Sequence, residues 1–165
     1  FRRRLRASGW TLSADTDFAG VVRACASAPR PGQEGGTWIG RQMLAAYVEL
    51  HRLGHAHSIE VRAGERLVGG IYGVAIGRMF FGESMFSGES GGSKAALAGL
   101  AQALAGWGWP LLDAQVENPH LLSLGARCLP RAEFMAQVAE LVRLEGRPGP
   151  WTGAFGRLPA ADLAG

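Results

Sequence analysis

The sequence predicts a mixed α/β domain with an antiparallel sheet at its centre. The first observation is the order of the expected elements, which runs β-α-α-β-β-β-α-β-α along the chain. The second is a pair of strand patterns over residues 67–75 and 78–83, close enough to form a hairpin. The third is size: 165 residues, 47% of them hydrophobic and 19% charged, suit one folded domain.

The first part of the chain predicts a short strand and two helices. Residues 10–12 form the strand, and Asp15-Thr16-Asp17 can cap the helix that follows. Apolar residues of this helix recur at helical spacing: Phe18, Val21, Val22 and Cys25. Composition indicates a loop at residues 29–36, and a second helix follows residues 37–39. Its inner side is expected to carry Met43, Tyr47, Leu50 and Leu53, with Gly54 after its last turn.

The middle of the chain predicts three consecutive strands over residues 57–62, 67–75 and 78–83. We expect the second hairpin to turn at Ile76 and Gly77, which would pair Val74 with Met79. Alternation then places Ile71, Gly73 and Phe80 on one face. Glycines at positions 69, 70 and 73 leave this part of the hairpin without side chains, so that a ligand can lie close to its backbone.

The last part of the chain returns to helices. Ser93 is expected to cap a helix from Lys94 to about Ala105, and residues 111–116 predict a further strand. A short helix through Leu124 and another over residues 131–143 follow. Residues 145–165 are rich in Pro and Gly, and we expect little regular structure there. The main domain would thus span residues 1–144, with a tail from 145 to 165.

The charge is concentrated at the start of the chain. The formal net charge is +3, and Arg2, Arg3, Arg4 and Arg6 leave a nearly neutral remainder when they are set aside. A basic edge on a neutral body favours contact with a phosphate backbone or an acidic partner. The alternative is a run of arginines that meets only solvent.

Two general features bear on where the protein works. Its apolar runs are short and interrupted by Gly, Arg or Glu, unlike those of a transmembrane helix. Cys25 and Cys128 do not make a disulfide framework, so we expect a reducing cytoplasm. Cys25 lies on an apolar stripe and is interpreted as a core residue.

Glu83 is a single carboxylate between two runs of aromatic and Met residues, at positions 79–81 and 85–86. Apolar neighbours on a half-buried strand would desolvate it, so such a carboxylate is either paired or available for chemistry. The alternative is a strand end whose glutamate points into water.

Asp113 and Gln115 stand two residues apart in the strand predicted at 111–116, and therefore on one of its faces. An Asp in the middle of a strand is disfavoured, and buried polar groups need partners. Either the two form a satisfied core network, or they join Glu83 in a polar cluster at the rim of the sheet.

Other patterns in the sequence give weaker evidence for a functional site. The Gly-rich loop before Lys94 lacks the Gly and the Ser or Thr of a Walker loop, which argues against nucleoside triphosphates. An acyl-CoA pyrophosphate would fit better, although Glu89 would repel it. His55 and His57 share a strand face without a third ligand at metal-binding spacing, so we interpret them as structural. His120 is interpreted as a loop residue.

Several blocks of the sequence closely resemble bacterial leucyl/phenylalanyl-tRNA–protein transferases. The longer blocks are residues 36–39 (GTWI), 53–61 (LGHAHSIEV), 67–75 (LVGGIYGVA) and 81–87 (FGESMFS). The match continues in the same order with Ser93-Lys94, residues 113–116 (DAQV), Asn118, His120 and residues 123–126 (SLGA). It covers residues 1–143.

The resemblance implies an aminoacyltransferase with an acetyltransferase-like (GNAT-like) fold and no metal or small-molecule cofactor. Such enzymes move Leu or Phe from a charged tRNA to the N-terminal Arg or Lys of a protein, marking it for degradation. Carried over by position, the resemblance assigns catalysis to Glu83 and Gln115, with Asp113 and Asn118 in their network. It assigns the pocket for the tRNA-borne side chain to Ile71, Phe80, Met85, Leu100 and Leu112, and a place near the acceptor end to Trp38.

The resemblance also implies that a domain precedes the basic segment in the family, whereas this sequence begins inside that segment. We therefore expect either a piece of a longer protein or a shortened member. Arg2, Arg3, Arg4 and Arg6 are expected to contact acceptor-stem phosphates. Two alternatives remain open: an acyl-CoA-dependent N-acyltransferase on the same fold, and an inactive RNA-binding fragment.

Overall fold

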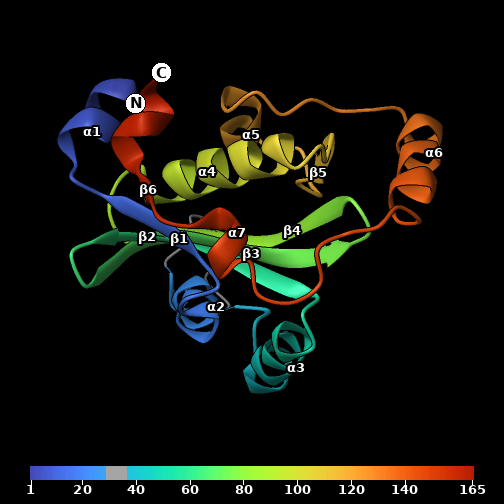
Figure 1. Cartoon of the computed structure of the whole chain (residues 1–165), viewed down its shortest axis with the longest axis horizontal. Helices are drawn as coiled ribbons and strands as arrows, with labels where there is room; N and C mark the ends of the chain where they lie inside the picture. Colours follow the sequence, from blue (N-terminus) through green and yellow to red (C-terminus); the bar gives the residue numbers. More distant parts are fainter. Residues whose placement is uncertain (29–36) are drawn as a thin grey trace.

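The computed structural model describes residues 1–28 and 37–165, so the loop predicted at 29–36 lies outside the described residues. Figure 1 shows the predicted mixed α/β architecture. Within the described residues, six strands form one sheet in the order β5-β4-β3-β2-β1-β6. They are β1 Thr11–Ala14, β2 Ala56–Ala63, β3 Arg66–Ile76, β4 Met79–Ser87, β5 Leu111–Asp113 and β6 Leu158–Pro159. Neighbouring strands are antiparallel except β4 and β5, which confirms the antiparallel centre.

Helices cover both faces of this sheet (Figure 1). α2 (Phe18–Ser27) and α3 (Arg41–Arg52) lie on one face, and α4 (Gly92–Gly106) lies on the other. α4 joins the parallel strands β4 and β5, which need such a crossover because they run in the same direction. The remaining helices are α1 Arg2–Ala7, α5 Pro119–Ser123, α6 Arg131–Leu141, α7 Thr152–Phe155 and the 3-10 helix η1 Ala160–Ala164. None of the described helices combines the length and apolarity needed to cross a bilayer.

The sheet separates two hydrophobic clusters. The α4 cluster contains Ile71, Phe80 and Leu100, and the α2–α3 cluster contains Phe18, Tyr47 and the predicted core residue Cys25. The expected inner side of α3 is only partly right. Its inner stripe passes through Leu44, Tyr47 and Leu50, so Met43 and Leu53 turn to solvent.

The hairpin between β3 and β4 has a different register from the one predicted. Ile76 pairs with Met79, so the turn consists of Gly77 and Arg78 and the predicted pairing of Val74 with Met79 is wrong. The reason is that a two-residue hairpin turn needs a positive φ at its first position, and Gly77 supplies it with φ +57°. Because the error is two residues, Ile71 and Phe80 still share one face.

The start of α4 also differs from the prediction. The helix begins at Gly92 after Gly91, whose φ is +94°, so Ser93 is not the N-cap. Ser87 takes over part of the capping, because its Oγ accepts a hydrogen bond from the Ser93 N–H at 2.9 Å. The loop and the helix are thus fixed by the last residue of β4.

The prediction that residues 145–165 have little regular structure is wrong. They form α7, β6 and η1, and β6 pairs with β1. Trp151 is 1% exposed and stacks on His57 with ring centres 3.8 Å apart. Asp15 fixes this arrangement: its Oδ2 accepts from the Trp151 N–H at 2.7 Å and lies 2.8 Å from His57 Nδ1.

Candidate functional site

Glu83 is the extra residue of a β-bulge. Gly73 of β3 pairs with Gly82, whereas the neighbouring Tyr72 pairs with Ser84, so Glu83 opposes no residue of β3. The bulge allows Met85 to pack in the α4 cluster and Phe86 in the α2–α3 cluster. The bulge therefore points the Glu83 carboxylate in a direction that the regular alternation of side chains along the strand would not give it. The alternation of apolar and polar residues in the sequence does not by itself predict this bulge.

The glycine before Glu83 permits a close approach of β5. Phe81 pairs with Asp113 across the parallel ladder. A Cβ added to Gly82 would lie 3.2 Å from the carbonyl oxygen of Asp113. Glu83 and Asp113 therefore belong to neighbouring strands at nearly the same height.

Tyr47 is the neighbour of Glu83 that the sequence analysis did not select as a site residue. Burial, a hydrogen bond with Glu83 and the negative charge of Glu83 together raise the pKa of the Tyr47 phenol above its ordinary 10.0. The same ring meets Trp38 edge-on, with ring centres 6.3 Å apart. Its place in the apolar stripe of α3 made it look like a core residue; its hydroxyl group was the available signal.

Asp113 and Gln115 lie close together but do not share a strand face, so that prediction is wrong. β5 ends at Asp113, and Gln115 has a φ of +66°. Asp113 Oδ1 accepts a hydrogen bond from the Gln115 N–H at 2.7 Å, which stabilises the turn. Gln115 is exposed and Asp113 is half-buried, so they do not form a buried core network.

Asn118 fixes the next turn of this segment. Its Oδ1 accepts a hydrogen bond from the Leu121 N–H at 2.9 Å, and Asn118 is the N-cap of α5. Asp113 and Asn118 thus stabilise the two ends of the loop that presents Gln115.

A groove of about 660 Å³ runs along this segment. Every residue from 110 to 117 lines it, and residues of α5, of α6 and of the connection between these helices form the rest of its wall. Leu112, Asp113 and Gln115 all belong to this lining. The groove therefore joins an apolar residue, a carboxylate and an amide among the predicted site residues.

The predicted pocket residues come together in the α4 cluster. Ile71, Phe80 and Leu100 are buried, while Met85 and Leu112 pack against them from partly buried positions. Leu112 links this cluster to the groove because it belongs to both. Trp38 lies elsewhere, on the α3 side, where 45% of it is exposed.

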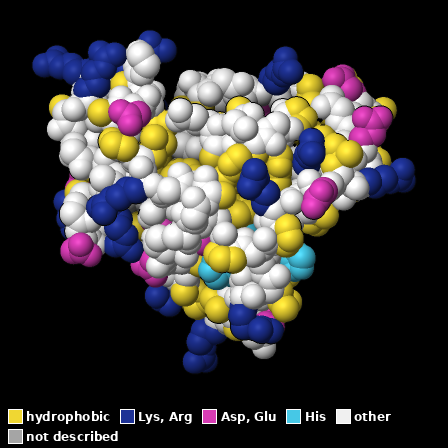
Figure 2. All heavy atoms as spheres, in the orientation of Figure 1, with side chains coloured by type: hydrophobic (Ala, Val, Ile, Leu, Met, Phe, Trp, Pro, Cys, Tyr) yellow, Lys and Arg dark blue, Asp and Glu magenta, His cyan; other side chains and the backbone are white. Residues whose placement is uncertain are grey.

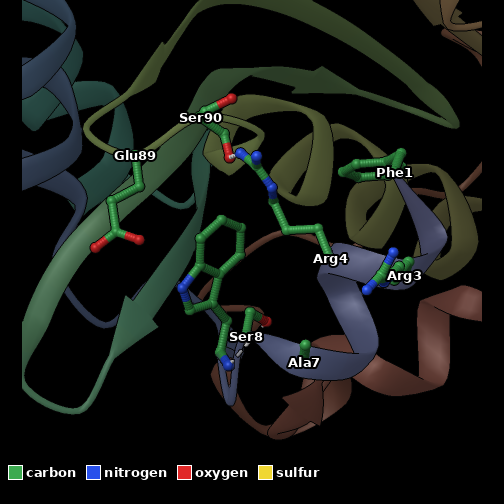
Figure 3. Close-up of a pocket in the computed structure, with 8 residues that line it drawn as sticks. Phe1, Arg3, Arg4, Ala7, Ser8, Glu89 and Ser90 are labelled. Atoms are coloured by element: carbon green, nitrogen blue, oxygen red, sulfur yellow. Dashed lines mark hydrogen bonds between the residues drawn. The ribbon is translucent and has the colours of Figure 1, made fainter.

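The arginines at the start of the chain lie on α1, at a different end of the molecule. Lys and Arg side chains gather at the upper left of Figure 2, where Figure 1 places α1. Arg3 and Arg4 line a hollow of about 690 Å³. Figure 3 shows Arg4 reaching from α1 to donate a hydrogen bond to the Ser90 carbonyl oxygen. Arg6 donates to the Ala164 carbonyl oxygen at 3.2 Å, so α1 is tied to the body of the protein.

None of His55, His57 and His120 lines this groove, and His120, predicted as a loop residue, lies in α5. His57 is 1% exposed and bonded to Asp15, whereas His55 and His120 are exposed. Among the residues that the structure describes, no three His, Cys, Asp or Glu side chains are grouped as a metal ion would require.

The structure is a mixed α/β domain with a groove of polar and apolar residues at one edge of its sheet. A family model described as leucyl/phenylalanyl-tRNA protein transferase matches residues 1–139, and the chain belongs to this family.

Relatives named leucyl/phenylalanyl-tRNA–protein transferase align with nearly the whole chain. The chain is 67% identical to the one from Xanthomonas oryzae pv. oryzae (strain MAFF 311018), over 99% of this chain and 65% of the relative. It is 65% identical to that of Xanthomonas campestris pv. campestris (strain B100), over 100% of this chain and 66% of the relative. For Xylella fastidiosa (strain M23) the identity is 57%, over 99% and 67%. The chain thus spans about 65% of the length of the first of these relatives.

Proposed function

We propose that the protein is an aminoacyltransferase that moves Leu or Phe from an aminoacyl-tRNA to the N-terminal Arg or Lys of a protein, marking it for degradation. The observation that carries the proposal is the meeting of β4 and β5, where Phe81 pairs with Asp113 two residues before the bulged Glu83, and Asp113 and Gln115 line the groove. Membership of the family supports it. In this proposal residues 1–144 form the main part of the aminoacyltransferase domain, and residues 145–165 complete its sheet and core.

The proposed reaction is the aminolysis of an ester. The nitrogen of the acceptor's α-amine attacks the aminoacyl carbonyl carbon, a C–N bond forms and the C–O bond to the terminal ribose breaks. The proton of the amine ends on the released ribose hydroxyl. An α-amino group has a pKa only slightly above neutrality, so a sizeable fraction is already nucleophilic. The ester is already activated, so the reaction needs no metal or organic cofactor.

Placement of the reactants is the main task of the site in this proposal, because correct positioning alone can remove roughly 7–11 kcal/mol of a barrier. Glu83 and Asp113 would orient the ammonium-bearing N-terminus and its cationic side chain. Gln115 would hydrogen-bond the amine or the reacting carbonyl, and its exposure in the groove suits that role. Asn118 would hold the loop through its cap on α5.

The α4 cluster is the proposed receptor for the Leu or Phe side chain. Ile71, Phe80, Met85 and Leu100 pack there with other apolar side chains, and Leu112 belongs both to this cluster and to the groove. Such a surface discriminates between apolar side chains by only about 1–3 kcal/mol per methylene.

The arginines of α1 are the proposed contact for the phosphates of the charged tRNA. Arg3 and Arg4 line a hollow beside the exposed helix, and Arg2 is exposed next to them. Trp38, half-exposed at the Glu83 side of α3, would contact the acceptor end. We further propose an acetyltransferase-like fold, which the antiparallel centre and the β4-α4-β5 crossover support, and action in the cytoplasm, where charged tRNA is found.

Transfer of labelled Leu from charged tRNA to a peptide beginning with Arg tests the proposal directly. The chain and a full-length relative should both transfer Leu to this peptide, and a peptide beginning with acetylated Arg should remain unlabelled. Transfer by the relative alone would identify the chain as an inactive part of the enzyme. Acetylation of the peptide by acetyl-CoA without tRNA would instead identify an acyl-CoA-dependent acyltransferase.

A further inference from the structure

The outer edge of β5 is open. β5 ends the strand order of the sheet, so within the described part of the chain its far side pairs with no strand. An edge strand presents backbone N–H and C=O groups that an extended peptide can pair with. The groove lies along this strand, since every residue from 110 to 117 lines it.

The groove has the size and walls of a peptide site. Its volume of about 660 Å³ falls within the range of about 300–1,000 Å³ that is common for binding sites. Leu122 of α5 is 44% exposed and Val116 is 69% exposed, and both line the groove. Its lining carries two residues of each charge sign, Asp113 and Glu117 against Arg127 and Arg131. Apolar patches between polar groups suit the alternating side chains of an extended segment.

The position of the candidate site fixes the direction of such a segment. Asp113 is the last residue of β5, and Gln115 follows it in the turn. If the reacting α-amine lies there, the segment must lead from the carboxyl end of β5 toward Leu111 at its amino end. The segment is then antiparallel to β5.

We propose that the open edge of β5 and its groove bind the extended N-terminal segment of the acceptor protein as an added antiparallel strand. The inference rests on the proposed function. Backbone pairing holds the residues after the first one without regard to their sequence, whereas the acidic groups select the first residue. Because β5 spans only Leu111–Asp113, the grip covers a few residues, and the acceptor must have an unfolded end.

Binding of N-methylated peptides tests the pairing without any transfer step. A peptide that begins with Arg and carries a fluorophore at its far end is titrated with the full chain in an anisotropy measurement. In an antiparallel ladder alternate residues point their N–H groups at the partner strand. N-methylation at alternate positions should therefore weaken binding about threefold to tenfold, the range for one backbone hydrogen bond, and the intervening positions should have no effect. An equal effect, or none, at all positions would overturn the inference.

A pair of matched variants tests whether the peptide binds in this groove. Leu122 lines the groove and Leu144 lies outside it, and the two are 44% and 45% exposed. Leu122→Ala should weaken peptide binding severalfold, whereas Leu144→Ala should leave it unchanged. Equal peptide binding by both variants, or a loss of charged-tRNA binding with Leu122→Ala, would overturn the inference. If N-methylation weakens binding at alternate positions but no Leu is transferred, the proposed reaction is refuted. If Leu is transferred but the effect of N-methylation does not alternate, only the docking mode is refuted.

Discussion

At the scale of residues, Tyr47 joins parts of the candidate site that are far apart in the sequence. Its ring contacts Trp38 and Tyr72 edge-on, and its hydroxyl group bonds Glu83. The phenol must be neutral to donate this hydrogen bond, and both burial and the nearby carboxylate favour the neutral form. In the proposed mechanism Tyr47 would therefore orient the carboxylate of Glu83.

The raised pKa of Tyr47 predicts an alkaline effect on stability. Since the folded state holds the proton more tightly than the unfolded state, this contribution is complete below the ordinary pKa of 10.0 and is lost as the pH rises above it. Tyr47→Phe should therefore flatten the fall of the unfolding free energy above about pH 10. Urea titrations of both proteins at several pH values measure this. Identical pH dependence would show that Tyr47 ionises equally in both states.

Gln115 predicts a kinetic effect without a structural one. It is exposed, and its turn is stabilised through its backbone N–H and not through its side chain. Gln115→Ala should lower the turnover rate of Leu transfer about 100-fold, the typical loss of one transition-state hydrogen bond, at an unchanged melting temperature. Single-turnover assays with charged tRNA, beside thermal unfolding, measure both. Full activity in the variant would remove Gln115 from the mechanism.

At the scale of elements, α1 is a charged helix fastened to the body. Arg4 and Arg6 bond backbone carbonyl oxygens of Ser90 and Ala164, so their removal would disturb the structure as well as the charge. Arg3 lines the hollow beside them and offers a more selective change.

Arg3→Ala should weaken charged-tRNA binding and lower the slope of log affinity against log salt by about 0.7–0.9, as for one lost phosphate contact. Arg23→Ala, an exposed arginine of α2 on another helix, is the control and should keep the wild-type slope. Filter binding at several salt concentrations gives both slopes. A slope that Arg3→Ala leaves unchanged would mean that this arginine meets only solvent.

Elements with a strong period could be predicted from the sequence, whereas the details that shape the site could not. α2 and the β2–β4 meander follow from apolar spacing and turn glycines. The bulge at Glu83 depends on how β3 pairs, and no local pattern records that. The end of β5 depends on a positive φ at Gln115, which Asp113 stabilises and which Gln rarely adopts alone.

At the scale of the whole molecule, the C-terminal segment acts as a belt from α6 to α1. It passes over the sheet at Trp151, where Asp15 and His57 hold it, and β6 extends the sheet beyond β1. The composition of this segment predicted a tail without regular structure, because Pro and Gly disfavour helices and strands. The packing of Trp151 arises from tertiary contacts, which composition does not report.

Trp151→Ala should lower the unfolding free energy by about 3–5 kcal/mol, the usual cost of removing a large buried aromatic side chain. Trp38→Ala is the matched control, since Trp38 is 45% exposed and its loss should leave the unfolding free energy almost unchanged. Chemical denaturation followed by circular dichroism measures both. If Trp151→Ala were as stable as the control, residues 145–165 would be dispensable for folding.

The extra residue in β4 has a consequence for the gene. Gly82 and Ser84 already pair with adjacent residues of β3, so the in-frame loss of the Glu83 codon would let β3 and β4 pair continuously without a bulge. Met85 and Phe86 would keep their present sides of the sheet. The shortened polypeptide should fold with a more regular hairpin and lack one acid group, so an ancestral or engineered deletion at this codon would separate architecture from chemistry.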